Sequence, residues 1–295
     1  MDLSKEQAKI ERAKWARIGA WAQWVVTLAT ALALIFTLRH GSEQLAATRE
    51  HQVTNRFAAA VNQVGSKTTE VRVGGVYALG RLMKDSPTDQ GTIVDVLAAF
   101  VRDRQHPQIN TSPPPDSYYG ELRIDIEGAI VTLQRWCQRN GSCVRLEGDE
   151  PLALDLSGVK FGSIDWEYNL PGADFFESNF SDAFILGADL SGGTFIGANM
   201  RDSFISEVDL QEASFFDADL SGVEIESTDL TKADLERADL QDSSLRDANL
   251  SGANLDDANL RGADLSKARV SCGQLAKADM DETTTVPDSC SGTRS

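Results

Sequence analysis

The most constraining feature of the sequence is a period of five residues that runs from Leu170 to Met280. Every fifth residue in this stretch is a large apolar side chain. In an α-helix, five residues turn the chain by about 500°, so these side chains would scatter around the axis. In a β-strand, five is an odd number, so they would alternate between the two faces. The period therefore excludes both regular elements as the main structure of this region.

A small residue stands two positions before most of the apolar ones, and Asp or Asn commonly lies between them, as in ADL at 188–190 and ANL at 253–255. The pattern fits a chain that turns a corner every five residues and winds as a four-sided coil of about 20 residues. Large and small residues then point to the axis, and backbone hydrogen bonds join neighbouring coils. We therefore predict an all-β right-handed quadrilateral β-helix, or solenoid, over residues 151–282, followed by a polar tail at 283–295.

The first coil is expected to be irregular. Leu156, Phe161 and Trp166 continue the period upstream, but only four residues separate Trp166 from Leu170. This break predicts an insertion or bulge. Because each coil is supported only by its neighbours, the two ends of the stack need covers. We expect the preceding helical residues to cap the first coil and the segment after Asp281 to cover the last.

The amino-terminal region contains a long uncharged segment, WAQWVVTLATALALIFTL at residues 21–38. As a helix it would rise about 27 Å, close to the hydrocarbon thickness of a bilayer. A signal peptide would have a shorter apolar core and a small-residue cleavage site, whereas Arg39, His40 and Gly41 follow directly. A buried helix of a soluble domain is a second alternative. We predict a transmembrane helix at 21–38 after a polar tail at 1–20, and hence a single-pass protein of the cell membrane.

Orientation follows weakly from basic residues. Five Lys or Arg residues precede the span between Lys5 and Arg17, and Arg39, Arg49 and Arg56 follow it. The bias favours an amino terminus inside the cell and a solenoid outside. The side of the membrane on which the solenoid lies remains open at this stage.

The middle of the chain has helical periodicity. Residues 42–103 predict short helices joined by tight turns, including helices at 71–85 and 92–103, in the manner of a stack of helical hairpins. Four prolines mark residues 104–120 as a linker. Residues 121–150 predict one more helix, ended by Asn140-Gly141, and the cap of the solenoid.

Charge and cysteines separate the two halves further. Residues 151–295 contain 28 acids and 10 bases, a net charge of −18, and the first 150 residues contain 17 acids and 18 bases, a net charge of +1. This acidity argues against direct nucleic-acid binding. Cys137 with Cys143 and Cys272 with Cys290 can form two disulfides in an oxidising compartment, and all four remain thiols in a reducing one.

The motif RADLQDSSLRDANLSGANLDDANLRGADL at 237–265 resembles the pentapeptide repeat family, whose fold is a quadrilateral β-helix. The helical stretch RFAAAVNQVGSKTTEVRVGGVYALGRLMKDS at 56–86, with IVDVLAAFVRDR at 93–104, also resembles a bacterial, often actinobacterial, membrane-anchored subset of that family. Many members of this subset carry two hydrophobic segments before the repeats. This chain has one, so the resemblance leaves the topology open.

Catalysis is not expected. The three histidines, His40, His51 and His106, lie outside the solenoid and far apart in sequence, and no nucleophile motif, phosphate loop or metal-ligand cluster is present. We therefore nominate no catalytic, cofactor-binding or metal-binding residue. The favoured hypothesis is a membrane-tethered scaffold that binds a protein partner, with end-to-end homo-oligomers also open. The alternative, implied by the resemblance, is a DNA mimic that binds a topoisomerase such as DNA gyrase.

Overall fold

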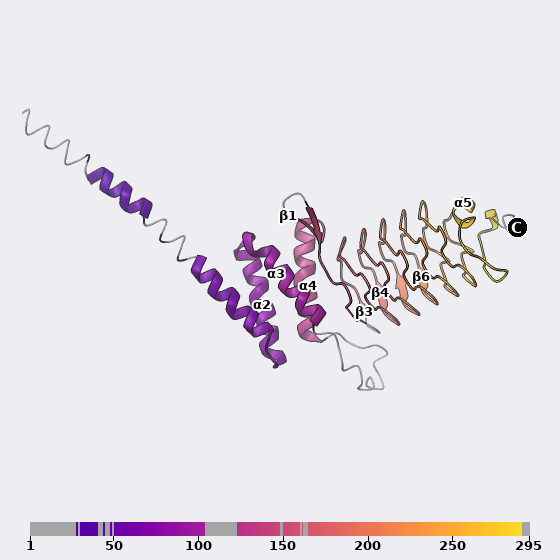
Figure 1. Cartoon of the computed structure of the whole chain (residues 1–295), viewed down its shortest axis with the longest axis horizontal. Coiled ribbons are helices and arrows are strands. Elements are labelled where there is room, and N and C mark those ends of the chain that lie inside the picture. The colour runs from indigo at the N-terminus through magenta and orange to yellow at the C-terminus, as the bar shows by residue number, and fades with distance from the viewer. Residues whose placement is uncertain are drawn as a thin grey trace, which may run out of the picture. The chain divides into compact units, whose positions relative to one another are not determined.

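The computed structural model describes residues 28, 30–40, 44, 48, 50–103, 123–147, 150–159, 161 and 165–290 (Figure 1). The chain divides into two compact units, Met1–Arg56 and Phe57–Ser295. The predicted polar tail at 1–20 and the linker at 104–120 lie outside the described residues.

In the first unit, residues 30–40 and 50–56 are helical. Of the predicted transmembrane segment, residues 21–27 and 29 lie outside the described part. Among the helices that the structure describes, none is both long enough and apolar enough to cross a membrane.

The second unit begins with a helical region. Residues 57–64 are helical, and three helices follow: α2 (Thr69–Asp85), α3 (Gln90–Asp103) and α4 (Ile124–Asn140). A 3₁₀ turn, η1 (Pro87–Asp89), separates α2 from α3, because the residue before a proline disfavours helical dihedrals. Gly141, with φ of 74°, ends α4 in the left-handed conformation typical of a helix C-terminus.

The three helices form one cluster, in which the short turn η1 joins α2 to α3. Each of α2, α3 and α4 contacts the other two. Leu79 and Met83 of α2, Leu97 of α3, and Ile130 and Leu133 of α4 are almost fully buried. Three mutually packed helices bury their apolar stripes against one another, so this region needs no further repeat to complete its core.

An antiparallel hairpin that sequence reasoning missed connects the helices to the solenoid. Strand β1 (Val144–Glu147) pairs with β2 (Glu150–Ala153). The Cys143 backbone N–H donates to the Pro171 carbonyl of the first coil at 2.7 Å. The Arg102 side chain of α3 forms an ion pair with Asp155. The start of the solenoid is therefore joined to the connecting segment by a backbone hydrogen bond and to α3 by an ion pair.

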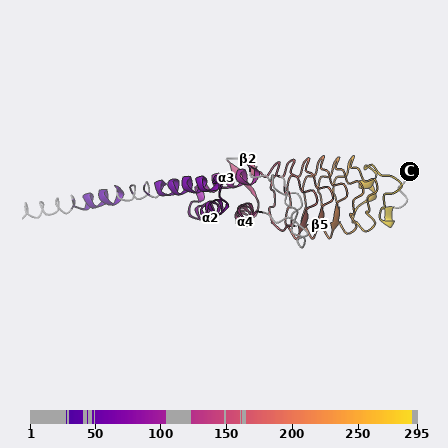
Figure 2. The same cartoon turned by 90° about the horizontal axis from the view of Figure 1, so that it is seen from below.

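The solenoid is a stack of four-sided coils (Figures 1 and 2). Isolated parallel bridges join residues one coil apart, as Asp189 with Asp209 and Asn199 with Asp219, so a coil contains 20 residues. One side of the stack is regular enough to form a four-stranded parallel sheet of β3 (Asp165–Trp166), β4 (Phe184–Leu186), β5 (Phe204–Ser206) and β6 (Glu224–Glu226).

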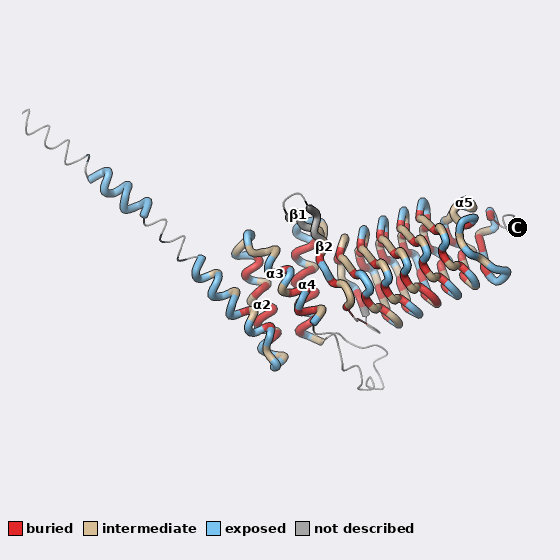
Figure 3. Tube along the Cα trace, in the orientation of Figure 1, coloured by how far each residue is buried: buried red, intermediate tan, exposed pale blue. Residues whose placement is uncertain are grey.

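The predicted core register is confirmed. Every fifth residue from Leu170 to Leu265 is buried, and so is Leu275 (Figure 3). Val270 and Met280, in the last coil, are half-buried. Inside the stack, the rings of Phe175, Phe195 and Phe215 lie one above another with centroids 4.9 Å apart. This separation matches the spacing of neighbouring strands, about 4.8 Å, so the aromatic column has the same rise as the backbone ladder.

The first coil is irregular, as predicted, but it is one residue shorter than the other coils and not longer. Trp166 pairs with Ile185, 19 residues later, whereas the standard offset is 20. The coil therefore lacks one residue between Trp166 and Leu170, and the predicted insertion or bulge is wrong. The Trp166 indole N–H donates to the Tyr168 carbonyl at 3.0 Å across this short link.

The end of the solenoid extends beyond the predicted boundary at 282. Thr285 pairs with Asp264, and Thr284, Val286 and Cys290 are buried, so part of the predicted tail at 283–295 completes the last coil. A short helix, α5 (Cys272–Leu275), replaces one side of that coil, and a 3₁₀ turn, η2 (Asp288–Cys290), follows. Two disulfides, Cys137–Cys143 and Cys272–Cys290, are present near the two ends of the stack.

The buried small-residue positions lead to a stability prediction. Ser243 Oγ is buried without a hydrogen-bond partner in the described structure, whereas Ser203 Oγ donates to the Met200 carbonyl at 2.7 Å. Alanine fills the equivalent position in many coils. Ser243→Ala should therefore raise the free energy of unfolding by about 1 kcal/mol, since it removes an unsatisfied polar group. Ser203→Ala, the matched control, should lower the free energy or leave it unchanged in denaturant unfolding. An equal response of the two variants would contradict the assignment.

Candidate functional site

The candidate site is the outer surface of the solenoid, because its side chains form rows at a fixed spacing. In each five-residue side, the residue before the core residue and the two residues after it point outward. The chain turns its corner at these last two positions. We call the core residue position zero, so the Asp or Asn position is −1 and the corner positions are +1 and +2.

The aspartates at position −1 stabilise the corners. Asp174 Oδ1 accepts the Phe176 N–H at 3.0 Å, and Asp219 Oδ1 accepts the Ser221 N–H at 3.1 Å. Asn199 makes the same bond to the Arg201 N–H at 3.1 Å. A side-chain oxygen two residues before an N–H is the usual stabiliser of a tight turn. The fold itself therefore explains the acids at this position.

The electrostatics of Asp219 agree with this structural role. Partial burial raises the pKa of its carboxyl, but the hydrogen bonds from Ser221 and the nearby Arg201 guanidinium outweigh burial, so the pKa lies below its ordinary value. Between coils, the Asn254 amide donates to Asp234 at 3.0 Å and the Asn259 amide donates to Asp239 at 2.8 Å. Asn placed above Asp thus relieves repulsion between stacked carboxylates.

The acids at position +2, unlike those at position −1, are not needed to stabilise the corner. This position has a positive φ at most corners of the solenoid, which glycine adopts without strain, and glycine occupies it at Gly192, Gly197 and Gly252. Acidic residues occupy the same conformation at other corners, with φ between 51° and 58°: Glu177, Asp182, Asp202, Glu207, Glu212, Asp217, Asp242 and Asp257. The fold does not require these carboxylates, since glycine serves equally well.

These corner acids concentrate on one side of the stack. We define the acidic face as residues 176–182, 196–202, 216–222, 236–242 and 256–262. It contains 10 acids and 3 bases, a net charge of −7, whereas the opposite face, residues 186–192, 206–212, 226–232, 246–252 and 266–272, contains 7 acids and 4 bases, a net charge of −3. Within the described structure, Glu177, Asp182 and Asp202 form no ion pair, while Asp217 pairs with Arg237 at 2.8 Å.

The packing of neighbouring coils reflects the corner acids. A Cβ at Gly222 would lie 2.2 Å from Asp202 Oδ1, and one at Gly262 would lie 2.1 Å from Asp242 Oδ1. Each of these aspartates leans over the corner of the next coil. Glycine at 222 and 262 is therefore needed both for its dihedral angles and for the space that the acid of the preceding coil occupies.

An apolar row borders the same face. Phe176, Ile196 and Phe216 occupy position +1 in successive coils, and Phe176 is 42% exposed. The Arg237 guanidinium lies 5.2 Å from the Phe216 ring centroid, in a cation–π contact. Apolar residues beside unpaired acids resemble the composition of protein interfaces, which combine an apolar centre with a polar rim.

A hollow of about 510 Å³ lies on the opposite face at the start of the stack, lined by Ser142 and Val144 of the connecting segment and by Gly172, Gly192 and Asp209 of the solenoid, among others. It is open and its walls are mostly small or polar. In the part of the chain that the structure describes, no group of three or more His, Cys, Asp or Glu side chains is arranged to hold a metal ion.

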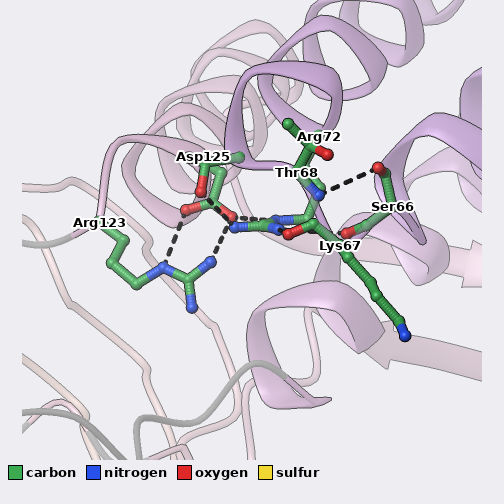
Figure 4. Close-up of polar contacts among 7 residues, drawn as sticks. Ser66, Lys67, Thr68, Arg72, Arg123 and Asp125 are labelled. Atoms are coloured by element: carbon green, nitrogen blue, oxygen red, sulfur yellow. Dashed lines mark hydrogen bonds and ion pairs between the residues drawn. The ribbon is translucent and has the colours of Figure 1, made fainter.

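Among the residues that the structure describes, the most buried charges lie in the helical region (Figure 4). Arg72 of α2 forms an ion pair with Asp125 of α4 at 2.5 Å, and both side chains are nearly inaccessible. Arg123 also contacts Asp125, at 2.8 Å. Burial raises the pKa of Asp125, but the two arginines outweigh it and hold the pKa below its usual range.

Buried ionisable clusters often mark catalytic sites, but this one is occupied by structural contacts. The Arg72 guanidinium also donates to the carbonyls of Ser66 and Lys67, at 3.1 and 2.9 Å, and to Thr69 Oγ1 at 2.8 Å. Arg72 therefore joins the turn before α2 to the beginning of α4 and has little capacity left for a ligand. Sequence reasoning did not single out Arg72 or Asp125, because no motif links residues 53 positions apart.

The two kinds of solenoid acid lead to a prediction at Asp219. Asp219→Ala should lower the free energy of unfolding by about 1 to 2 kcal/mol, because a hydrogen bond to a charged group is lost. Asp219→Asn keeps the acceptor oxygen that Asn199 uses in the coil below and should cost less. Because the folded pKa is depressed, the charged form stabilises above about pH 4 and this contribution is lost at lower pH. Denaturant unfolding at pH 7 and pH 3 measures both effects, and equal stabilities for the Ala and Asn variants would contradict this role.

Comparison with known proteins agrees with the architecture. A family model described as pentapeptide repeats matches eight copies within residues 169–206, 195–231, 205–242 and 243–281. No curated protein matches the chain significantly.

Several solved structures are similar to parts of the chain. HetL, a pentapeptide repeat protein of heterocyst differentiation regulation from the cyanobacterium Nostoc, is 27% identical over 42% of this chain and 49% of its own, with a TM-score of 0.33. This chain thus spans about half the length of HetL. A pentapeptide repeat protein from the Arabidopsis thaliana thylakoid lumen is 22% identical over 40% of this chain and 81% of its own, with a TM-score of 0.30. QnrB1, a plasmid-mediated fluoroquinolone resistance protein, is 16% identical over 44% of this chain and 87% of its own, with a TM-score of 0.28.

The family match covers the residues whose five-residue period, buried core and parallel bridges are described above. Residues 169–281 therefore form a solenoid of pentapeptide repeats.

Proposed function

We propose that the chain is a non-catalytic, membrane-tethered scaffold whose acidic face binds a protein partner with a basic surface. The observation that carries the proposal is the set of corner acids in the left-handed conformation on that face. A non-glycine residue in this conformation costs roughly 1 kcal/mol, less for Asp than for Glu. Backbone strain that the fold does not require is a pointer to function.

The charge of these acids suits long-range attraction of a basic partner. Glu177, Asp182, Asp202, Asp242 and Asp257 are exposed. Asp182, Asp202 and Asp242 share one corner of the stack, because they are separated by one and two coils of 20 residues. Rows of like charge on a rigid surface raise the local potential and the rate of association with an oppositely charged surface. The adjoining apolar row of Phe176, Ile196 and Phe216 supplies area that is released from water when a partner covers it.

A tether at residues 21–38 is supported by the exposed helix in the first unit. Leu32, Leu34, Ile35, Phe36 and Leu38 are each 59–67% exposed. Consecutive residues of a helix point in different directions, so these side chains occupy several sides of it. A helix that is apolar around its circumference requires an apolar environment, and a bilayer supplies one.

The two disulfides support a position of the solenoid outside the cytoplasm. Disulfides form and persist in oxidising compartments and are rare in the cytosol. The excess of basic residues before the predicted span favours the same orientation. A DNA mimic that binds gyrase would need to reach the cytoplasm, so the disulfides argue for the scaffold and against that alternative.

Cysteine labelling in intact cells tests the proposed topology. The four native cysteines are paired, so Lys267→Cys would supply an exposed thiol on the solenoid and Ser4→Cys would supply one before the predicted span. A membrane-impermeant maleimide should label the cysteine at 267 in intact cells and the cysteine at 4 only after lysis. Protection of 267 until lysis would place the solenoid in the cytoplasm, overturn the external scaffold and favour the DNA mimic. An assay of gyrase supercoiling with the purified chain would then follow.

A further inference from the structure

A pocket in the helical region has the opposite charge to the solenoid. It measures about 160 Å³ and lies between α2 and α4. Four bases line it, Arg81 and Lys84 from α2 and Arg135 and Arg139 from α4, together with Tyr77, Gly80 and Thr132. No acidic residue lines it, although the whole chain has a net charge of −17.

The packing of α2 against α4 brings these bases together. The contacts of Arg72 with Asp125, of Val76 with the position of Gly128 and of Gly80 with Thr132 show that the two helices run parallel. A Cβ at Gly80 would lie 3.2 Å from Thr132 Cγ2, so glycine permits the close approach. Lining residues repeat at intervals of three, four and seven along each helix, which places them on one side of it.

No ion pair with another described residue neutralises the positive charge of the pocket. Arg81, Lys84, Arg135 and Arg139 are exposed, and none has an ion pair among the described residues. Most bases of the solenoid differ in this respect, as in the pairs Arg201–Asp219, Arg246–Asp264 and Arg261–Asp279.

The C-termini of α2 and α4 neutralise only part of the positive charge of the pocket. Both helices end near the pocket, and each C-terminus carries about half a negative charge. Four bases against two half-charges leave an excess of about three positive charges. The pocket has the liquid volume of roughly five water molecules, which is ample for one tetrahedral oxyanion. Guanidinium groups bind phosphate oxygens in bidentate fashion.

We propose that this pocket binds a phosphate group, held by Arg81, Lys84, Arg135 and Arg139. The phosphate belongs either to the headgroup of an anionic membrane lipid or to a soluble molecule. Thr132 Oγ1 already donates to the Gly128 carbonyl at 2.8 Å, so the four bases carry the recognition. This site is independent of the acidic face and of the topology proposed above.

Phosphorus NMR of the full chain in a neutral detergent tests the site. Inorganic phosphate and dihexanoyl phosphatidylglycerol are titrated separately, and broadening of each phosphorus resonance gives an apparent Kd. The test variant is Arg135→Gln/Arg139→Gln. The control is Lys267→Gln/Arg269→Gln, which removes the same charge from exposed solenoid residues. Circular dichroism verifies that both variants fold.

We expect binding of one or both phosphates by the wild type and a Kd at least about tenfold higher in the test variant, because hydrogen bonds between charged groups are lost. The control should change the Kd less than about twofold. Tighter binding of the lipid identifies a headgroup as the source, and binding of inorganic phosphate alone identifies a soluble ligand. Absence of binding to either probe, or equal loss in both variants, would overturn the proposal.

Discussion

The corner that the chain must turn after every five residues is the constraint on which the solenoid depends. A side this short leaves room for one large and one small inward residue, and the backbone must then change direction in a conformation with positive φ. Every other regularity follows from this corner. The carboxylate or amide at position −1 satisfies an N–H that the turn exposes, and the remaining N–H and carbonyl groups pair with the neighbouring coils. Each coil is thus stabilised by the coil on either side, as in other solenoids.

The core register could be predicted from the sequence because position in the period determines burial. The large residues from Leu170 to Leu265 are inside without exception, and the column of Phe175, Phe195 and Phe215 follows directly from their spacing by one coil. The break in the five-residue period at Trp166 was also visible in the sequence. Whether the first coil contained an extra residue or lacked one was not. A step of four residues fits either an extra or a missing residue until the pairing of Trp166 with Ile185 is known.

The helical region was less predictable, since contacts between distant residues determine it. Periodicity located α2, α3 and α4 to within a few residues, but it could not indicate that α2 and α4 lie parallel and share the Arg72–Asp125 ion pair. The hairpin of β1 and β2 was missed because its short strands have no extended alternation. The two disulfides were predictable only as one of two alternatives, because cysteine spacing does not reveal the redox compartment.

The central claim is that the solenoid contains acids of two kinds, those that hold corners together and those that the fold does not need. The Asp or Asn at position −1 was visible in the sequence as part of the repeat, whereas the status of the acids at position +2 depends on their left-handed backbone and could be recognised only in the structure. The most direct test is the thermal unfolding of a variant in which Glu177, Asp182, Asp202, Asp242 and Asp257 are all replaced by glycine. Glycine should relieve left-handed strain and like-charge repulsion in the folded state, but it raises the entropy of the unfolded chain. The gain and the cost are each about 1 kcal/mol or less per residue, so they should offset each other. The account predicts a melting temperature equal to or above that of the wild type. A melting temperature several degrees lower would show that the corner acids stabilise the fold and would contradict the account.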